Sequence, residues 1–355
     1  MKKTKKILIS PLDWGLGHAS RDIPIIQKLI ELGHEVIIAG SGNSLLLLKT
    51  EFPQLKSIYL PSFKIKYSKG KSQLFRILIS SPKFLFCIFR EYKLLNKIIS
   101  SEKIDIVISD NRYGLFNSKC YSIIITHQLL IKIPKSVSFI EKILQKINYY
   151  FIEKFAQCWI PDYEKEPNIS GELGHPEIIP LNAVYIGHLS RFHKTFNDYG
   201  NIKENDILVI LSGPEPQRSI LEKILIAQIS KIDYKTIFVR GANEFFNKIE
   251  DSENIKFIQF ADSKTITKLI KSSEIVISRA GYSTIMDLAA LSKKAILIPT
   301  PGQTEQEYLA EYVKNKVWFF TQKQDELNIS QAICEVKKYK MPEIEENEFG
   351  FLSTF

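Results

Sequence analysis

The stretch that decides the fold runs from Ser278 to Gln306 and reads SRAGYSTIMDLAALSKKAILIPTPGQTEQ. The residues just before it, Glu274 to Ile277, include an apolar run that is typical of a buried strand in a parallel sheet. A tight turn then leads into a helical pattern, and a second apolar run follows over residues 295–298. We therefore interpret this part of the chain as a strand, a helix and a second strand of an α/β sheet.

The turn between the first strand and the helix has the features of a diphosphate site. Gly281 permits backbone angles or close approaches that a side chain would obstruct, and Ser283 and Thr284 are able to cap the helix. The N–H groups of the first helical turn, the helix dipole and the cation of Arg279 all suit a diphosphate. Asp287 lies one helical turn after Ser283, where a carboxylate could accept hydrogen bonds from two ribose hydroxyls.

The chain over residues 279–308 follows the pattern R-x-G-x-x-T-x-x-[DE]-x-A, then a strand, then P-x-x-x-Q-x-x-Q-x-Y. This pattern resembles the donor site of glycosyltransferase family 28, which includes the enzyme that adds N-acetylglucosamine to a polyprenyl-linked peptidoglycan precursor. Plant galactolipid synthases and UDP-glucuronosyltransferases have related versions. The resemblance implies the GT-B fold, an α/β fold of two Rossmann-like, doubly wound parallel-sheet domains facing across a cleft.

The rest of the chain alternates short apolar runs with helical patterns. Further strands are expected at residues 7–9, 36–39, 104–108, 122–125, 158–160, 207–211, 236–239, 255–260 and 317–320. Repeated βα units predict parallel sheets, which bind ligands at the carboxyl ends of their strands. Because 355 residues exceed one typical core, we expect two α/β domains. The resemblance implies that residues 1–195 form the acceptor-binding domain and residues 196–340 the nucleotide-sugar domain, with a tail over 341–355.

The resemblance also implies donor contacts outside the opening stretch. Residues 185–191 resemble the family's Gly-Asn-Pro-Val-Arg segment, so Arg191 is expected to reach the diphosphate. Residues 211–217 stand where relatives have Gly-Gly-Ser-x-Gly, and residues 260–262 resemble a stretch whose backbone pairs with uracil. The first two segments depart from the pattern of the peptidoglycan enzyme, which argues against that enzyme itself. The expected donor-binding residues are Arg191, Ser212, Gly213, Phe260, Ala261, Arg279, Gly281, Tyr282, Ser283, Asp287, Gln303, Gln306 and Glu307.

The loop that begins at Pro11, PLDWGLGHASR, is the second strong signal. Gly15 and Gly17 let the backbone bend closely around a substrate, and in resembling families this loop belongs to the acceptor-binding domain. His18 is expected at the start of the next helix, where an imidazole suits a general base near neutral pH. Asp13 is a rival base, because some related transferases place an Asp in this loop.

Two further loops are expected at the same edge of the sheet. Asp110 follows a strand and could hold and polarise His18, as the acid of a triad does; a turn-forming role beside Asn111 is the alternative. His127 and Gln128 follow the next strand, in a stretch that resembles a His-Glu-Gln-Asn segment of the peptidoglycan enzyme and so indicates acceptor contact. The expected catalytic residues are His18, Asp110 and Asp13, and the expected acceptor-binding residues are Gly15, Gly17, His127 and Gln128.

Much of the net charge of +9 lies in residues 64–103, which hold ten Lys and Arg residues against two Glu. At helical spacing, Phe86 and Phe89 lie off the core-facing stripe of Phe84, Ile88, Tyr92, Leu95 and Ile99. A basic and aromatic face suits an anionic membrane surface that carries a lipid-linked substrate; a solvated basic face is the alternative. Nucleic acid is not expected as a partner, because no binding motif accompanies the charge.

Several features favour a cytoplasmic location, and the basic face described above adds the possibility of peripheral attachment to the inner face of the plasma membrane. No apolar run approaches the length of a membrane span. The basic N-terminus is interpreted as the lead of the first strand rather than as a signal peptide. The four cysteines lack metal-ligand spacing and are expected to be buried thiols in a reducing compartment; they are Cys87, Cys120, Cys158 and Cys334.

These observations predict an inverting, metal-independent transferase that moves a sugar from a UDP-sugar to a hydroxyl of a lipid-linked or cell-envelope glycan acceptor. N-acetylglucosamine is the first choice of sugar by resemblance. No Asp-x-Asp motif is present to hold a divalent cation, and neither a metal nor a cofactor is expected. One alternative is a UDP-sugar 2-epimerase with Asp110 and Glu305 beside the sugar. The other is a non-catalytic nucleotide-sugar-binding subunit that docks at a membrane.

Overall fold

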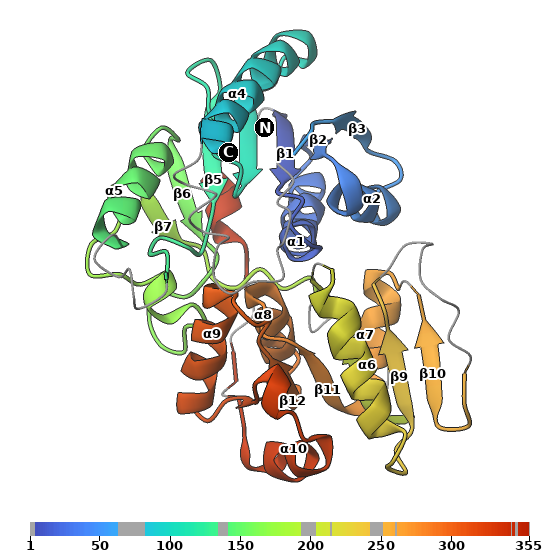
Figure 1. Cartoon of the computed structure of the whole chain (residues 1–355). Coiled ribbons are helices and arrows are strands. Elements are labelled where there is room, and N and C mark those ends of the chain that lie inside the picture. Colours follow the sequence, from blue (N-terminus) through green and yellow to red (C-terminus); the bar gives the residue numbers. More distant parts are fainter. Residues whose placement is uncertain are drawn as a thin grey trace. The chain divides into compact units, whose positions relative to one another are not determined.

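The computed structural model describes residues 4–62, 82–133, 141–192, 204–213, 215–241, 251–259, 261–341, 343–344 and 347–354. These residues form two compact units, each built on its own parallel sheet (Figure 1). The chain passes from the first unit to the second between Arg191 and Phe192, and the residues from Asn347 onward belong again to the first unit.

The first unit holds a seven-stranded sheet in the order β3-β2-β1-β4-β5-β6-β7, in which all neighbouring strands are parallel. Its strands are β1 (Lys6–Pro11), β2 (Glu35–Gly40), β3 (Lys56–Tyr59), β4 (Ile106–Asp110), β5 (Tyr121–Ile125), β6 (Gln157–Ile160) and β7 (Ala183–Tyr185). The central strands β1 and β4 are buried almost throughout, as expected for a parallel sheet with both faces covered.

The helices of this unit are α1 (Gly17–Glu31), α2 (Gly42–Glu51), α4 (Pro82–Glu102) and α5 (Glu141–Ile152), with the 3₁₀ turns η2 (Gly171–Leu173) and η6 (Gly350–Thr354). Strand order reverses between β1 and β4, because β2 lies on one side of β1 and β4 on the other. The loops that follow β1 and β4 therefore leave the carboxyl edge of the sheet side by side, at the position where α/β sheets bind ligands.

The second unit holds a six-stranded parallel sheet in the order β10-β9-β8-β11-β12-β13. Its strands are β8 (Asn205–Ile210), β9 (Thr236–Val239), β10 (Ile255–Ile258), β11 (Ser273–Arg279), β12 (Ala295–Ile298) and β13 (Phe320–Thr321). Its helices are α6 (Gln217–Ile229), α7 (Ser263–Ser272), α8 (Tyr282–Ala290), α9 (Thr304–Asn315) and α10 (Ile329–Glu335), with the 3₁₀ turns η4 (Gln324–Glu326) and η5 (Val336–Lys338). Strand order reverses between β8 and β11, so the ends of these two strands form the corresponding edge.

The predicted pair of parallel α/β sheets is confirmed, and β9 and β12 have the expected bounds. The sequence did not reveal β3 and β7, which are short edge strands without a buried run. The expectation of buried thiols is confirmed for Cys158 and is wrong for the other three cysteines, because Cys87 and Cys120 are half-buried and Cys334 is exposed.

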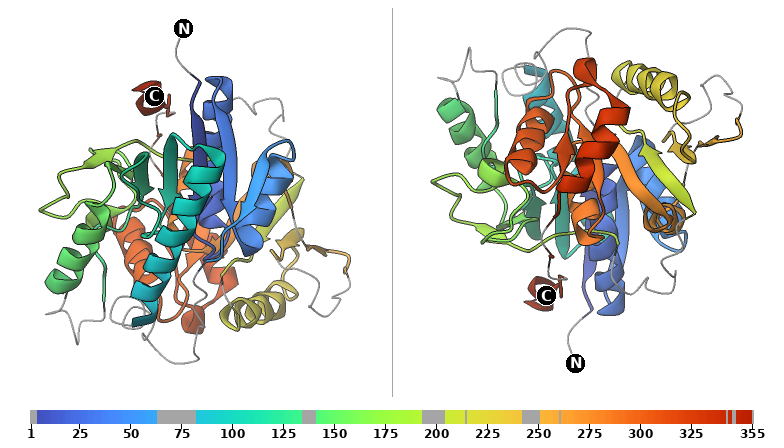
Figure 2. Two further views of the ribbon diagram at one scale, coloured as in Figure 1. Left: turned by 90° about the horizontal axis from the view of Figure 1, so that it is seen from above. Right: turned by 90° about the horizontal axis from the view of Figure 1, so that it is seen from below.

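The C-terminal residues pack against the first unit, beside the end of β7 (Figure 2). Asn347 Nδ2 donates to the carbonyl oxygens of Ile186 and His188, at 2.7 and 3.0 Å. The Phe351 ring lies 4.8 Å from the ring of Trp159 and meets it edge to face. The last residues therefore belong to the fold of the first unit.

Candidate active site

The first unit brings together two residues predicted to form a catalytic pair. His18 lies in the first turn of α1, and Asp110 ends β4, beside the end of β1. His18 Nδ1 and Asp110 Oδ1 are 2.8 Å apart; the Asp110 side chain is fully buried and that of His18 is 15% exposed. A carboxylate at Nδ1 holds the ring proton there and leaves Nε2 as a proton acceptor, which is the arrangement a general base needs.

Arg21 binds the same carboxylate from the next turn of α1. Its Nε atom donates to Asp110 Oδ2 at 2.5 Å, and its Nη2 atom donates to Oδ1. Burial opposes ionisation of Asp110, but the positive charge of Arg21 and the interaction with His18 outweigh it and lower the pKa to about 2. Asp110 is therefore a carboxylate at neutral pH.

The predicted acceptor-binding residues lie in the same region of the first unit. His127 follows β5, is buried, and its Nδ1 atom lies 3.1 Å from Arg21 Nη1. Gly17 is the first residue of α1. Gly15 has a φ of +97°, which disfavours any other residue, and a Cβ there would meet no atom within 4 Å. The loop thus bends at Gly15 and leaves open space beside it, as the sequence predicts.

Asp13, the rival base, has a different role. Its carboxylate accepts hydrogen bonds from the Ser44 backbone N–H and the Ser41 hydroxyl, at 3.2 and 3.4 Å. Ser41 is the N-cap residue of α2, so Asp13 supplies the negative charge that a helix N-terminus favours. Gly42 allows this close approach, because a Cβ there would lie 2.0 Å from Asp13 Oδ2. We therefore assign Asp13 to the cap of α2 rather than to proton transfer.

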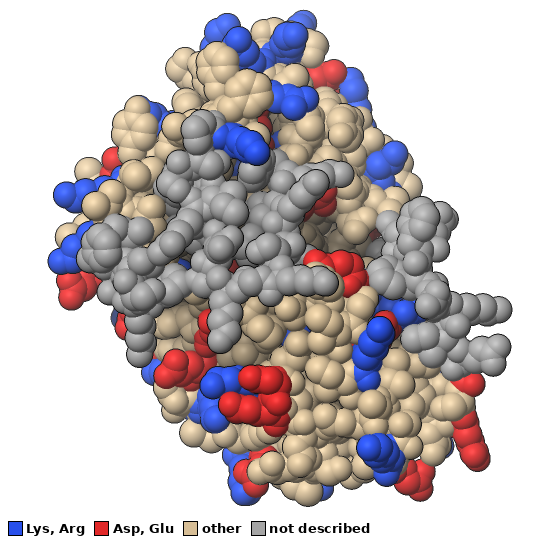
Figure 3. Space-filling view, viewed as in Figure 1, with Lys and Arg blue, Asp and Glu red and all other residues tan. Residues whose placement is uncertain are grey.

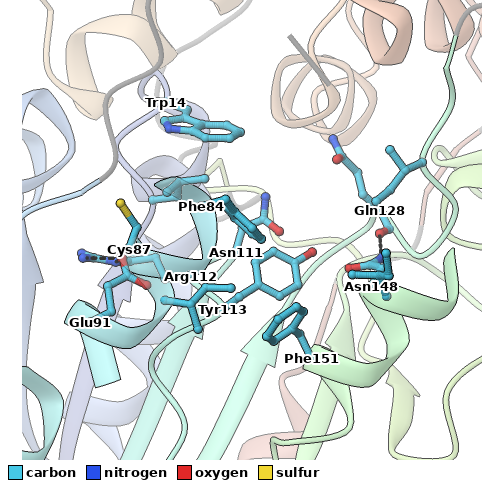
Figure 4. A pocket seen from close by; sticks show the side chains of 14 residues that line it. Trp14, Phe84, Cys87, Glu91, Asn111, Arg112, Tyr113, Gln128, Asn148 and Phe151 are labelled. Atoms are coloured by element: carbon cyan, nitrogen blue, oxygen red, sulfur yellow. Dashed lines mark hydrogen bonds and ion pairs between the residues drawn. The ribbon is translucent and has the colours of Figure 1, made fainter. Parts of the chain in front are cut away.

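A cavity of about 730 Å³, part of it open to solvent, lies within the first unit (Figure 4). Three of its lining residues adjoin the pair described above: Trp14 is in the loop before His18, Asn111 follows Asp110, and Gln128 follows His127. Most of the wall is apolar and comes from α4, α5 and the loops after the strands. The full set of lining residues is Leu12, Trp14, Phe84, Cys87, Ile88, Glu91, Asn111, Arg112, Tyr113, Gln128, Ile131, Ile147, Asn148 and Phe151. Residues next in sequence to Asp110 and His127, and one in the loop before His18, thus form part of the cavity wall.

Around this cavity, α4 and α5 expose apolar side chains. Phe86 is 64% and Phe89 54% exposed, as the helical pattern predicts. The exposed set also includes Leu85, Ile143, Ile147 and Tyr150. Lys93 lies 4.4 Å from the ring centre of Phe89, and Lys154 lies 4.3 Å from that of Tyr150. Lys and Arg side chains gather over α4 in the space-filling view (Figure 3). The basic segment predicted over 64–103 lies within the described residues only from Pro82 onward.

None of the described helices combines the length and the apolar character that a bilayer-spanning helix requires.

In the second unit, the opening stretch forms β11, a tight turn, α8 and β12, as predicted. Gly281 is the N-cap of α8, whereas Ser283 and Thr284 lie inside its first turn, which corrects their expected capping role. The Gly281 φ of −80° is open to any residue, and a Cβ there would meet only Thr284 Oγ1, at 3.9 Å. Neither backbone strain nor crowding within the chain requires this glycine. Asp287 is 8% exposed, one turn after Ser283.

Arg279 is a second correction. Its side chain is buried, and Nη2 donates to the carbonyl oxygen of Gln217 and to Gln324 Oε1, both at 2.7 Å. Nη1 donates to the carbonyl oxygen of Pro299 at 3.3 Å. Burial lowers the Arg279 pKa to about 10, so the group stays charged at neutral pH. The guanidinium therefore joins the loops around α8 rather than projecting toward a diphosphate.

Other predicted donor residues also hold loops in place. Gln306 Oε1 accepts from the Thr300 N–H at 2.9 Å, and Glu307 Oε1 accepts from the Gly302 N–H at 2.8 Å, so both close the loop after β12. Gln303 is the N-cap residue of α9. Tyr282 is buried in the core at the start of α8, so its side chain does not face solvent.

The remaining predicted donor residues lie at loop ends. Ser212 and Gly213 are exposed after β8, and Ala261 is half-buried before α7. Arg191 is the last residue of the first unit before the crossing to the second. Phe260 lies outside the described residues.

Sequence reasoning missed Arg21 and the α5 wall of the cavity. Arg21 lies three residues after His18, and this spacing puts both on one face of a helix, which is a usable signal. Ile147 and Phe151 have the i, i+4 spacing of an amphipathic helix, but that pattern does not show which face lines a cavity.

Comparison with known proteins agrees with this geometry. Residues 214–348 match the model of the glycosyltransferase family 28 C-terminal domain, and residues 5–155 match that of glycosyl transferase family 1. A Clostridium perfringens UDP-N-acetylglucosamine–N-acetylmuramyl-(pentapeptide) pyrophosphoryl-undecaprenol N-acetylglucosamine transferase is 23% identical over 100% of this chain and 94% of its own.

Two further similarities concern the whole fold. A Methanosarcina acetivorans protein described as an uncharacterized glycosyltransferase is 25% identical over 88% of this chain and 84% of its own. The crystal structure of the glycosyltransferase of kitacinnamycin superposes with a TM-score of 0.63 at 11% identity, over 95% of this chain and 91% of that chain. The chain therefore has the GT-B fold of glycosyltransferases, and its residues 214–348 are similar to the glycosyltransferase family 28 C-terminal domain.

Proposed function

We propose that this protein transfers a sugar from a UDP-sugar to a hydroxyl group of a lipid-linked or cell-envelope glycan acceptor, with inversion at the anomeric carbon. The observation that carries the proposal is the pairing of His18 with Asp110. It is supported by an apolar cavity whose wall includes Trp14, Asn111 and Gln128, from the same loops of the first unit as His18, Asp110 and His127. The printed name of the Clostridium relative supports N-acetylglucosamine as the first sugar to test and a polyprenyl-linked compound as the first acceptor class.

In the proposed reaction, the acceptor hydroxyl binds at His18. The Nε2 lone pair of His18 takes the hydroxyl proton as the oxygen forms its bond to the anomeric carbon. The bond from that carbon to the diphosphate oxygen breaks at the same time, and UDP leaves with the electron pair. Asp110 stabilises the imidazolium that results, because its carboxylate lies 2.8 Å from Nδ1.

We place the donor on the second unit, at the start of α8. The N–H groups of its first turn and the helix dipole favour the diphosphate, and Asp287 is the proposed ribose ligand. An open approach at Gly281 supports this placement, since among the described residues only Thr284 Oγ1, at 3.9 Å, comes within 4 Å of a Cβ placed there. Neutralisation of the leaving group by protein groups, without a metal or cofactor, is part of the proposal.

The cavity supports an acceptor with an apolar portion. Trp14 lies in the loop before His18, and Asn111 and Gln128 lie in the loops after β4 and β5; all three line the cavity, whose apolar wall includes residues of α4 and α5. The exposed apolar and basic side chains of these helices support docking at an anionic membrane surface. We therefore propose a peripheral enzyme on the cytoplasmic face of a membrane.

A UDP-sugar 2-epimerase is the second candidate that the sequence raised. It needs Asp110 as a carboxylate available to the sugar. Both Asp110 oxygens are instead engaged, by His18 and by Arg21, and the side chain is fully buried. This observation favours the transferase.

Calorimetric titration with UDP, UDP-N-acetylglucosamine and UDP-glucose tests the proposal, on the wild type and on Asp287→Ala. We expect micromolar to sub-millimolar binding of UDP that is lost in Asp287→Ala, and the order of the sugars identifies the donor. Conversion of a UDP-sugar without any acceptor would point to the epimerase. Binding without turnover in any acceptor mixture would point to a non-catalytic subunit.

A further inference from the structure

Three groups from three segments of the first unit contact one side chain, Arg21. His18 and Arg21 lie on one face of α1, Asp110 ends β4, and His127 follows β5. The Arg21 guanidinium donates to both oxygens of Asp110, and it lies 3.1 Å from His18 Nδ1 and 3.1 Å from His127 Nδ1. Its side chain is 1% exposed. Arg21 is thus the common neighbour of both candidate histidines.

The contact with His127 fixes the protonation of that ring. A guanidinium has five N–H donors and no acceptor, so an atom hydrogen-bonded to Arg21 Nη1 must offer a lone pair. His127 Nδ1 is that atom and is therefore unprotonated. The proton of the neutral His127 ring then resides on Nε2, which makes Nε2 a hydrogen-bond donor.

His18 has the opposite tautomer. Asp110 is ionised, since its pKa is about 2, and a carboxylate only accepts hydrogen bonds. The 2.8 Å contact therefore requires a proton on His18 Nδ1, and Nε2 carries the lone pair. In this arrangement, His18 Nδ1 and Arg21 Nη2 are two donors that converge on the same oxygen, Asp110 Oδ1, and their 3.1 Å separation is a consequence.

Asp22 completes the balance of charge around Arg21. It is fully buried, and burial together with the negative charge of Asp110 raises its pKa well above the usual range. Burial thus disfavours a second anion beside Asp110. The titratable groups around Arg21 include Asp22 and His18 from α1, Asp110 from β4, and His127 after β5. Arg21 and Asp110 are the opposed charges of this group.

We infer that Arg21 is a positioning residue that holds His127 in the tautomer opposite to that of His18, so that His127 carries its ring proton on Nε2 while Asp110 keeps the His18 ring proton on Nδ1. If the proposed function holds, His18 Nε2 is then the ring nitrogen that accepts the proton of the acceptor hydroxyl, because the Nδ1 lone pair of His127 is engaged by Arg21.

Long-range ¹H–¹⁵N NMR correlation on histidine-labelled protein tests this inference without any substrate. A bare ring nitrogen and a protonated one have well-separated ¹⁵N shifts, and His18→Gln and His127→Gln assign the two rings. We expect the wild type at neutral pH to show Nδ1–H for His18 and Nε2–H for His127. In Arg21→Gln we expect His127 to become a mixture of tautomers, while His18 keeps its Nδ1–H through Asp110.

Arg112→Gln is the matched control, since Arg112 is another buried arginine of the first unit, paired with Glu91 at 2.9 Å. It should leave the tautomers of His18 and His127 unchanged. A wild-type His127 with Nδ1–H would overturn the inference, and so would an unchanged His127 in Arg21→Gln. If Arg21→Gln fails to fold, the wild-type spectrum decides. These spectra do not depend on transferase activity, so failure of the proposed function leaves them interpretable.

Discussion

His18 and Asp13 are two candidate bases on one loop, and their surroundings separate them. The Nδ1 atom of His18 is held by Asp110, whereas Asp13 is committed to the N-terminus of α2. We predict that His18→Gln lowers kcat by roughly 10²–10⁴-fold and leaves UDP affinity unchanged. Asp13→Asn should lower kcat less than about threefold and destabilise the protein by about 1 kcal/mol, because it weakens the cap of α2. Steady-state kinetics and thermal unfolding of both variants measure this, and a larger kcat loss in Asp13→Asn would reverse the assignment.

Asp110 and Asp22 give opposite pH dependences of stability. The folded pKa of Asp110, about 2, lies below the value of 3.8 for a free carboxyl group, so its contribution of about 2 kcal/mol is present above pH 4 and is lost as the pH falls toward 2. The folded pKa of Asp22 is raised. Its contribution to folding stability is therefore complete when the pH is below the ordinary carboxyl pKa, and it declines as the pH rises above that pKa.

Asp22→Asn isolates the second effect. The amide has the same shape and cannot ionise in the unfolded chain, so the variant loses the decline in stability that Asp22 causes at rising pH. We predict that the melting temperature of Asp22→Asn, measured relative to that of the wild type, is higher at pH 7 than at pH 5. Thermal unfolding at these two pH values measures it, and a difference between the two proteins that does not change with pH would contradict a raised pKa of Asp22.

At the scale of single elements, the start of α8 makes the clearest prediction. Gly281 has an ordinary φ and room for a Cβ, so Gly281→Ala should change the free energy of unfolding by less than about 1 kcal/mol. If a diphosphate lies against this turn, the added methyl group obstructs it, and we expect UDP affinity to fall at least tenfold. Calorimetry and thermal unfolding decide, with Gly350→Ala, which also has open space, as the control. Unchanged UDP affinity would place the donor elsewhere.

The sequence predicts elements better than it predicts contacts between them. The strands and the α8 turn follow from local apolar runs and turn residues, and the meeting of His18 with Asp110 follows because loops after neighbouring parallel strands share an edge. The acceptors of Arg279 come from residues 217, 299 and 324, which no local pattern connects to it. The hydrogen bond from the Ser44 N–H to Asp13 likewise joins residues that are far apart in sequence. These are two of the places where the structure changes a predicted role.

At the scale of the whole molecule, the exposed apolar side chains of α4 and α5 predict membrane binding. We expect wild-type protein to bind vesicles that contain phosphatidylglycerol and to release them at high salt, since each lysine near the surface contributes about 1 kcal/mol. The double variant Phe86→Ser, Phe89→Ser should bind at least tenfold more weakly. Leu181→Ser is the control, because Leu181 is fully exposed but lies outside both helices. Equal vesicle binding by all three proteins would contradict membrane docking through Phe86 and Phe89.

The most direct test of the central claim is the release of UDP from UDP-N-acetylglucosamine in the presence of a polyprenyl-linked acceptor, compared between the wild type and His18→Gln. We predict that the wild type releases UDP and increases the acceptor mass by one sugar residue, whereas His18→Gln binds UDP equally well and transfers nothing measurable. Wild-type protein that binds neither UDP nor any UDP-sugar at millimolar concentration would contradict the account, and full transfer by His18→Gln would contradict its chemistry.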